Sequence, residues 1–223
     1  MKIEEAYLSI ISQQRVDEAN LKNIIASAAI AGSALAPQPT ANSELDRYLP
    51  RIEHVKAAQR EILKMKHAHI TKAITDYKYK VNERTAAKIA AAVMKYEDPV
   101  FPKAHHILGF IAHESNFKPA ATNSNSSAYG LMQVIPVHHN IVRQDMFDID
   151  SEIKHGVRVL KDNYAKVKNE EGTYRSYYSG YGAYKDKKRN KDKENAYFKE
   201  ISPHIDHFKD VMQKWDQKFD PKR

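Results

Sequence analysis

The stretch "PVFPKAHHILGFIAHESNF", residues 99–117, joins a helix-starting proline to an apolar run that ends in a single acid. Pro102 can stand at a helix start, where its missing N–H is not needed. The apolar residues that follow fall at helical spacing on one face: Ile107, Phe110 and Ile111. Glu114 continues this face. Desolvation there disfavours the charged carboxylate, and a helix that stops near Phe117 adds the negative end of its dipole. The pattern predicts an acid that stays protonated near neutral pH, and its alternative is a glutamate that ends a helix and points to water.

The sequence after this acid is nearly uncharged. From Ser115 to Val134 it holds no acid and, apart from Lys118, no base. A turn-prone segment, "NSNSSAYG", leads into "GLMQVIP", an apolar run with one uncharged amide at Gln133. Uncharged donors and acceptors suit a sugar better than a phosphate or an ionic ligand, so this region favours a carbohydrate site.

The composition predicts an all-α protein. The 223 residues include seven glycines and nine prolines, spread through long stretches rich in Ala, Lys, Glu and Ile. We expect one helix or two from Leu45 to about Tyr79, and another over residues 85–97. A length of 223 residues supports one sizeable core and a smaller extension.

Two later apolar stripes predict further helices. The first has Ser151 as its expected N-cap and Gly172 beyond its end. The second follows Pro203, and the basic run Lys185–Lys193 before it is expected to be a solvated loop. The two stripes consist of Ile153, Val157, Leu160, Tyr164 and Val167, and of Ile205, Phe208, Met212, Trp215 and Phe219.

The least polar segment, "NIIASAAIAGSALA" at residues 23–36, has three interpretations. It is too short to span a bilayer comfortably. "ALA" before Pro37 resembles a signal cleavage site, but Glu4, Glu5 and Asp17 are unusual in a positively charged leader. A signal core, a membrane-contacting helix and a helix packed in the protein therefore all stay open, with the packed helix favoured.

Charge and residue types limit the classes of function. The net charge of +8 favours polyanionic partners, among them nucleic acid, anionic lipid and wall polymers, without choosing between them. The absence of cysteine excludes disulfides and thiolate-bound metals. No phosphate-binding glycine loop, nucleophile elbow or paired-histidine zinc motif occurs, so we expect no cofactor and no metal site, and no specific nucleic acid partner.

Five pieces of the sequence resemble the soluble lytic transglycosylase family, over about residues 86–184. Three lie around the acid: "ES" at 114–115, "NFKP" at 116–119 and "AYGLMQVIP" at 128–136. "DIDSEIKHGVRVL" is similar to the family helix with an asparagine or acid, an isoleucine, a glycine and a leucine, and "SYYSGYGAY" is similar to its "AYNAG" segment. The resemblance implies a lysozyme-like helical fold that cleaves the β-1,4 bond between N-acetylmuramic acid and N-acetylglucosamine in peptidoglycan.

The resemblance also implies a mechanism with one carboxylate. Glu114 would protonate the glycosidic oxygen and then take the proton of the muramic acid C6 hydroxyl, which closes a 1,6-anhydro ring. Most glycosidases use two carboxylates, but in substrate-assisted enzymes the substrate replaces the second. The residues implied to bind the substrate are Ser115, Met132, Gln133, Tyr177 and Tyr178.

The sequence departs from the family pattern at two positions of interest. Tyr177 matches the tyrosine of "AYNAG", whereas Tyr178 with the next two residues matches the "YSG" variant of phage members, so either tyrosine could be the one that contacts the sugar. Ser127 stands where the family usually has glycine. His113, next to the acid, is expected to be a partly exposed bystander.

These features define the predicted organisation and setting. We expect an N-terminal apolar segment at 1–40, a helical extension at 41–84, a transglycosylase domain at 85–200 and a C-terminal helix at 201–223. The predicted location is a phage virion acting in the host periplasm and wall, with virion proteins or a membrane as further partners of the N-terminal helices. The alternatives are a bacterial periplasmic wall-remodelling enzyme, and a structural virion or wall-binding protein that has lost activity.

Overall fold

The computed structural model describes residues 42–142, 146, 148–186 and 190–219, with side chains from residue 57 onward. The predicted segment 1–40, including the three interpretations of residues 23–36, lies outside this range. The chain divides into two compact units, and residues 67–214 form the larger one. The smaller unit contributes residues 42–66 and 215–219 to the described part. The four predicted domain boundaries stay predictions.

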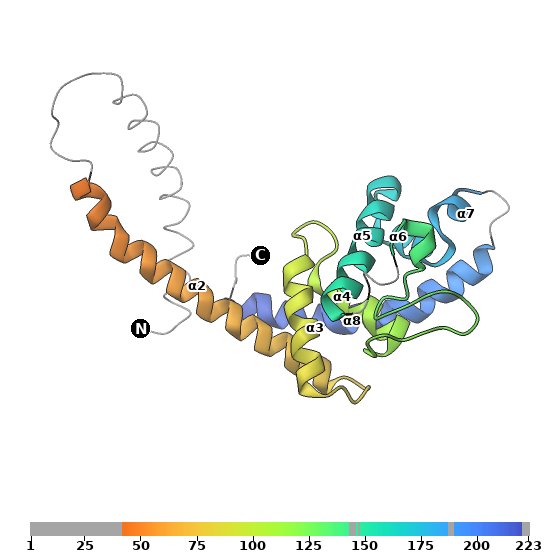
Figure 1. Cartoon of the computed structure of the whole chain (residues 1–223), viewed down its shortest axis with the longest axis horizontal. Helices are drawn as coiled ribbons and strands as arrows, with labels where there is room; N and C mark the ends of the chain where they lie inside the picture. Colours follow the sequence, from red (N-terminus) through yellow and green to blue (C-terminus); the bar gives the residue numbers. More distant parts are fainter. Residues whose placement is uncertain (1–41, 143–145, 147, 187–189, 220–223) are drawn as a thin grey trace, which may run out of the picture. The chain divides into compact units, whose positions relative to one another are not determined.

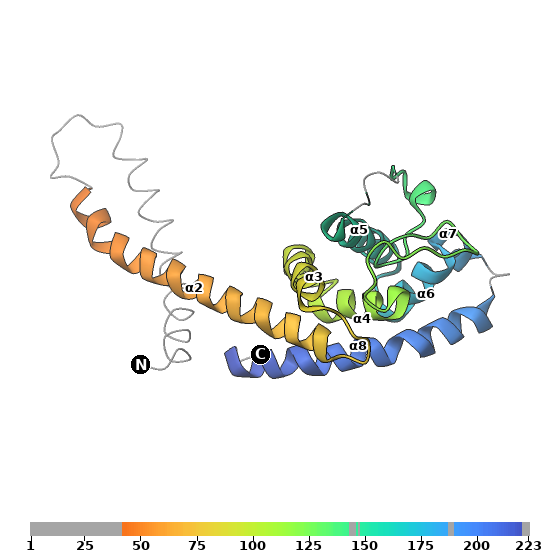
Figure 2. The ribbon, with the colours of Figure 1, turned by 60° about the horizontal axis from the view of Figure 1, so that its bottom comes forward.

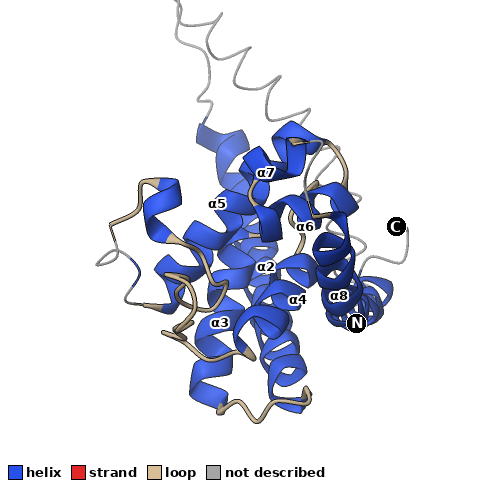
Figure 3. Cartoon of the chain, turned by 90° about the vertical axis from the view of Figure 1, so that its right-hand side faces the viewer, coloured by secondary structure: helices blue, strands red, loops and turns tan. Residues whose placement is uncertain are grey.

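The described residues are helices joined by loops (Figures 1 and 3), which confirms the all-α prediction. No strand occurs among them, and two isolated bridges, Thr122 with Tyr129 and Tyr129 with Val134, form the only pairing of extended chain there. None of the described helices is long and apolar enough to cross a membrane. The α-helices are α2 (Asn42–Asp76), α3 (Glu83–Tyr96), α4 (Ala104–Ser115), α5 (Ile149–Val167), α6 (Glu170–Ser179), α7 (Tyr181–Lys185) and α8 (Lys191–Phe219), and a 3₁₀ turn, η1, spans Pro136–His139.

Two predictions about the helix ends were wrong. Asp148 caps α5 in place of Ser151, because its carboxylate accepts the Ser151 N–H at 2.9 Å and an anion suits a helix N-terminus. Gly172 lies beyond the end of α5, as predicted, and belongs to the next helix, α6, which Asn169 caps. The basic run is not all loop, because α7 ends at Lys185 and α8 starts at Lys191.

The core of the larger unit surrounds α4, whose apolar face is fully buried, as the stripe predicted. α8 runs alongside α4 (Figure 2), and Gly109 permits their close approach. A Cβ at Gly109 would lie 2.4 Å from Ile205 Cγ1, which is too short for any side chain. The buried apolar face of α4 consists of Ile107, Leu108, Phe110 and Ile111.

The loop between α4 and η1 is fixed by a buried acid on α5. Glu152 is 1% exposed, and its two carboxylate oxygens accept the N–H groups of Ala120 at 3.0 Å and Leu131 at 2.9 Å. Gly130 has φ +82 and lies so close to this carboxylate that a Cβ would be 2.8 Å from Glu152 Cγ. The first turn of α5 therefore sets the path of the loop next to the predicted catalytic acid.

Candidate active site

Glu114 lies in the last turn of α4, one residue before its C-terminal Ser115. The helix ends through a left-handed Asn116, whose N–H donates to the carbonyl of Ile111. Burial raises the pKa of the Glu114 carboxyl to about 7, and a hydrogen bond from Tyr197 opposes this shift in part. The raised pKa expected from the apolar stripe is thus confirmed, and near neutral pH both protonation states of Glu114 are populated.

Tyr197, from α8, is the closest partner of this carboxyl. Its hydroxyl donates to Glu114 Oε1 at 2.5 Å, and its ring is 7% exposed. Burial and the Glu114 carboxylate raise the pKa of Tyr197 well above its ordinary value, so the phenol stays a donor at neutral pH. The structure thus gives the acid a neutral, fixed hydrogen-bond donor.

The two predicted tyrosines of α6 both lie near this pair, in different ways. Tyr177 donates its hydroxyl to the carbonyl of Met132 at 2.7 Å, and its pKa is raised by burial and by Glu114. Tyr178 is 46% exposed and stacks on the Tyr197 ring, with centroids 5.0 Å apart. Tyr177 therefore supports the loop under the acid, while Tyr178 offers an open aromatic face.

The other predicted substrate-binding residues hold the site in shape. Ser115 is buried, and its hydroxyl donates to the carbonyl of Ile111 at 3.0 Å. Met132 is fully buried against Gly156, where a Cβ would come within 2.3 Å of its sulfur. Gln133 has φ 47, and its amide NH₂ donates to the carbonyls of Ala121 and Gly130 at 3.1 and 2.9 Å. These contacts fix the loop and leave the Gln133 amide oxygen as the acceptor that a ligand could use.

His113 is partly exposed, as expected, but it contacts Tyr197, the residue that donates to Glu114. Its ring meets the Tyr197 ring edge to face, with centroids 4.9 Å apart, and lies 5.7 Å from the His204 ring. The pKa of His113 is lowered, mainly by burial. Glu200 opposes this shift, and Lys78 adds to it. The neutral imidazole therefore packs behind the phenol that donates to Glu114.

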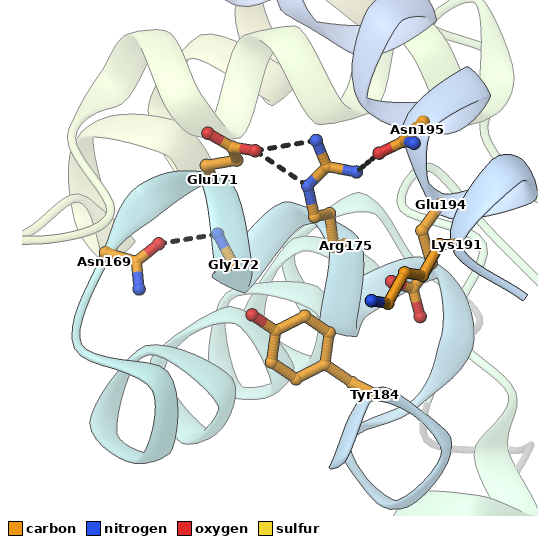
Figure 4. Close-up of a pocket in the computed structure, with 8 residues that line it drawn as sticks. All are labelled: Asn169, Glu171, Gly172, Arg175, Tyr184, Lys191, Glu194 and Asn195. Carbon is orange, nitrogen blue, oxygen red and sulfur yellow. Dashed lines mark hydrogen bonds and ion pairs between the residues drawn. The ribbon is translucent and has the colours of Figure 1, made fainter. Parts of the chain in front are cut away.

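A cavity of about 300 Å³ lies between α6, α7 and the start of α8 (Figure 4). Arg175 donates to Glu171 at 2.7 and 2.9 Å and also to Asn195. Tyr184 and Lys191 line the same cavity. The Arg175 guanidinium is therefore already paired with a carboxylate of its own helix.

Among the described residues no group of three or more His, Asp or Glu side chains could hold a metal ion.

Sequence reasoning missed Tyr197. The residue lies 83 positions after Glu114, so no local pattern links the two. One signal was present: Tyr197 precedes Ile201 by four residues, and Ile201 precedes Ile205 by four. Extending the C-terminal stripe backward would have placed Tyr197 on the face of α8 that packs on α4.

These features define a lysozyme-like, all-α domain with a single raised-pKa glutamate at the end of a central helix. Residues 91–199 match the family model described as "Transglycosylase SLT domain". The match runs from α3 into α8, so it includes Glu114, Tyr177 and Tyr197, and it supports the SLT family. At the family level it supports lytic transglycosylase activity with peptidoglycan as the substrate. Neither the curated proteins nor the solved structures contain a match to this chain.

Proposed function

We propose that this protein is a lytic transglycosylase that cleaves the β-1,4 bond between N-acetylmuramic acid and N-acetylglucosamine and leaves a 1,6-anhydro end, with Glu114 as acid and base. The observation that carries the proposal is the environment of this carboxyl. Burial raises its pKa to about 7, and its hydrogen-bond partner is a neutral phenol. A group with such a pKa can donate a proton and then accept one within the same cycle at neutral pH.

In the first step, the protonated Glu114 gives its proton to the glycosidic oxygen as the bond from that oxygen to C1 of the muramic acid breaks. The substrate's acetamido group stabilises the positive charge that develops at C1, as in other substrate-assisted glycosidases. In the second step, the Glu114 carboxylate removes the C6 hydroxyl proton while O6 bonds to C1. The proton returns to Glu114, and no water is consumed.

The surroundings of Glu114 support a reaction without a second carboxylate. Burial and the Tyr197 phenol account for the shift in its pKa, and within the described residues no carboxylate contributes to it. Glu152, the acid of the neighbouring loop anchor, has both oxygens occupied by backbone N–H groups. The second group that the reaction needs must then come from the sugar.

Substrate binding is proposed for Ser115, Met132, Gln133, Tyr177 and Tyr178. Tyr178 would stack an exposed ring on a sugar, and the Gln133 amide oxygen would accept a sugar hydroxyl. Ser115 and Met132 would act through the backbone that they hold in place, since both side chains are buried. Tyr177 would keep the Met132 carbonyl in position beside the acid.

The mass of the muropeptide products tests the activity. Purified sacculi would be digested with the wild type and with Glu114→Gln, because anhydro ends are lighter by one water than hydrolysed ends. We expect anhydro products from the wild type alone. Equal release by both proteins would disprove the role of Glu114, reducing ends would make the protein a hydrolase, and release by neither would favour a structural or wall-binding protein.

We further propose that the protein is carried in a phage virion and opens the host wall locally. This role accounts together for its predicted N-terminal extension, its net charge of +8 and its "YSG" segment. Other virion proteins or a membrane would then be partners of the N-terminal region. Mass spectrometry of purified particles should detect peptides of this chain. Detection of a mature form beginning at Pro37 in periplasmic extracts would support a bacterial wall-remodelling enzyme.

A further inference from the structure

A second cavity, of about 410 Å³, lies within the larger unit on the C-terminal side of α4. One wall is the connection between α2 and α3, residues 78–82, together with Thr85 in the first turn of α3. The opposite wall is the segment 116–119, which follows directly on the end of α4. The cavity is thus built partly from the "NFKP" segment that comes after the proposed catalytic acid.

The lining of this cavity is strongly basic. Lys78, Lys80 and Lys118 contribute three ammonium groups, and no Asp or Glu is among the described residues that line it. None of these lysines forms an ion pair within the described part of the chain. The Lys78 ammonium lies over the rings of Tyr77 and Tyr79, 5.8 and 5.0 Å from their centroids, which restrains it at the cavity. An anionic ligand would relieve the mutual repulsion of the three charges.

The cavity of Figure 4 differs in this respect. Its guanidinium, from Arg175, is neutralised by Glu171 within the same helix. A mixed lining of that kind offers little attraction to an anion. The three-lysine cavity is therefore the stronger anion site of the two.

The three-lysine cavity lies close to Glu114. Asn116, which lines it, is two residues from the acid, so their Cα atoms are at most about 8 Å apart. Lys78 also contributes to lowering the pKa of His113, whose ring contacts Tyr197. A polymer bound at Glu114 could reach the cavity with a side branch two or three residues long, since an extended chain spans about 3.3–3.6 Å per residue.

We propose that this three-lysine cavity binds the carboxylates of the peptide attached to the muramic acid at the cleaved bond. The inference rests on the proposed function and adds a determinant of substrate choice to it. The peptide leaves the sugar at the lactyl group and carries its carboxylates along a short extended chain, and two or three extended residues span the separation of at most about 8 Å between the Cα atoms of Glu114 and Asn116. The Tyr79 ring and the Asn116 side chain supply apolar contact and hydrogen bonds for the peptide between the charges.

The test compares two glycan substrates that differ only in peptide charge. One carries native peptides, and in the other the peptide carboxylates are converted to neutral methylamides. We expect the wild type to cleave the native strands with a kcat/KM about tenfold higher, because exposed ion pairs each contribute modestly. The triple variant Lys78→Gln, Lys80→Gln and Lys118→Gln should cleave both substrates equally, at the rate of the wild type on the neutral one.

A matched control separates this effect from net charge. Lys88, Lys209 and Lys214 are exposed and line neither cavity, so their triple change to Gln removes the same charge elsewhere and should keep the tenfold preference. Changing the three cavity lysines to Arg should keep most of it as well. Melting curves of all variants show that each is folded, and the rate on neutral strands reports an intact catalytic centre.

The outcomes separate this inference from the proposed function. Equal cleavage of the two substrates by the wild type, or loss of the preference in the control triple variant, would overturn the cavity assignment and leave the transglycosylase intact. Failure of the wild type to form anhydro ends on either substrate would overturn the proposed function and this inference with it. If the cavity variant keeps its preference but loses retention on a wall phosphate polymer, the cavity binds that polyanion instead.

Discussion

Two glutamates of this protein, Glu114 on α4 and Glu152 on α5, have the same side chain but different hydrogen-bond partners. Burial is the first cause of a raised pKa for both carboxyls. Glu152 has two backbone N–H donors, one for each oxygen. Glu114 has one phenol on one oxygen.

This difference separates a structural acid, which holds the fold together, from a chemical acid, which can exchange a proton with a substrate. When both oxygens of a buried carboxylate accept fixed backbone donors, the group ties two loop segments to a helix and has no oxygen left for a substrate. When one oxygen accepts a single phenol and the other does not take part, the group can exchange a proton. Burial by itself does not distinguish the structural acid from the chemical acid. The number and kind of hydrogen-bond donors do.

The largest effect is expected when the chemical acid is neutralised. Glu114→Gln should lower the rate of anhydro product formation by about 10³-fold, because it removes both proton transfers. The matched variant Glu152→Gln should retain measurable activity. A Glu114→Gln protein that keeps more than a tenth of the wild-type rate on sacculi would show that the comparison assigns the roles incorrectly.

The same substitution should stabilise the protein in a pH-dependent way. The pKa of Glu114 is about 7 in the folded state against an ordinary value of 4.5, so the folded state keeps this carboxyl protonated up to a higher pH than the unfolded state does. The wild type therefore loses stability as pH rises from about 4.5 to about 7, whereas Glu114→Gln lacks this loss. The free energies of unfolding of the two proteins should then differ by up to about 3 kcal/mol above pH 7. Urea unfolding at pH 4, 6 and 8 measures this difference. A difference that does not grow with pH would argue against a desolvated carboxyl.

Removing the structural acid should have a different consequence. Glu152→Gln replaces one acceptor oxygen by an NH₂ group and leaves a buried backbone N–H without a partner. The free energy of unfolding should fall by about 1–3 kcal/mol. Thermal and urea unfolding at pH 8 check this value. Unchanged stability would mean that the loop does not depend on the anchor.

The smallest effect concerns the phenol on the chemical acid. Tyr197 donates to the carboxylate and so lowers the pKa of Glu114. Tyr197→Phe should raise that pKa further, which moves the alkaline limb of the kcat/KM profile to higher pH because the free enzyme needs the protonated acid. Tyr178→Phe, which removes a hydroxyl from the ring stacked on Tyr197, is the matched control and should leave the limb where it is.

Several parts of the fold and site could be predicted because they depend on short-range periodicity. The apolar stripe before Glu114 places this acid at the end of a buried helix, and α4 has this form. The low glycine content and long helix-forming stretches predict an all-α chain. The caps were less predictable, as Asp148 and Asn169 show, because neighbouring polar residues compete for the same N–H groups.

The sequence by itself determined the all-α class, the position of Glu114 at the end of a buried helix face and the uncharged segment after it, because each follows from residue types at fixed spacing along the chain. Only the tertiary structure decided that Tyr197 donates to Glu114, that Glu152 anchors the loop, and that three lysines from two segments share one cavity. These contacts join residues far apart in sequence, and the packing of α8 and α5 against the centre of the domain fixes which side chains meet.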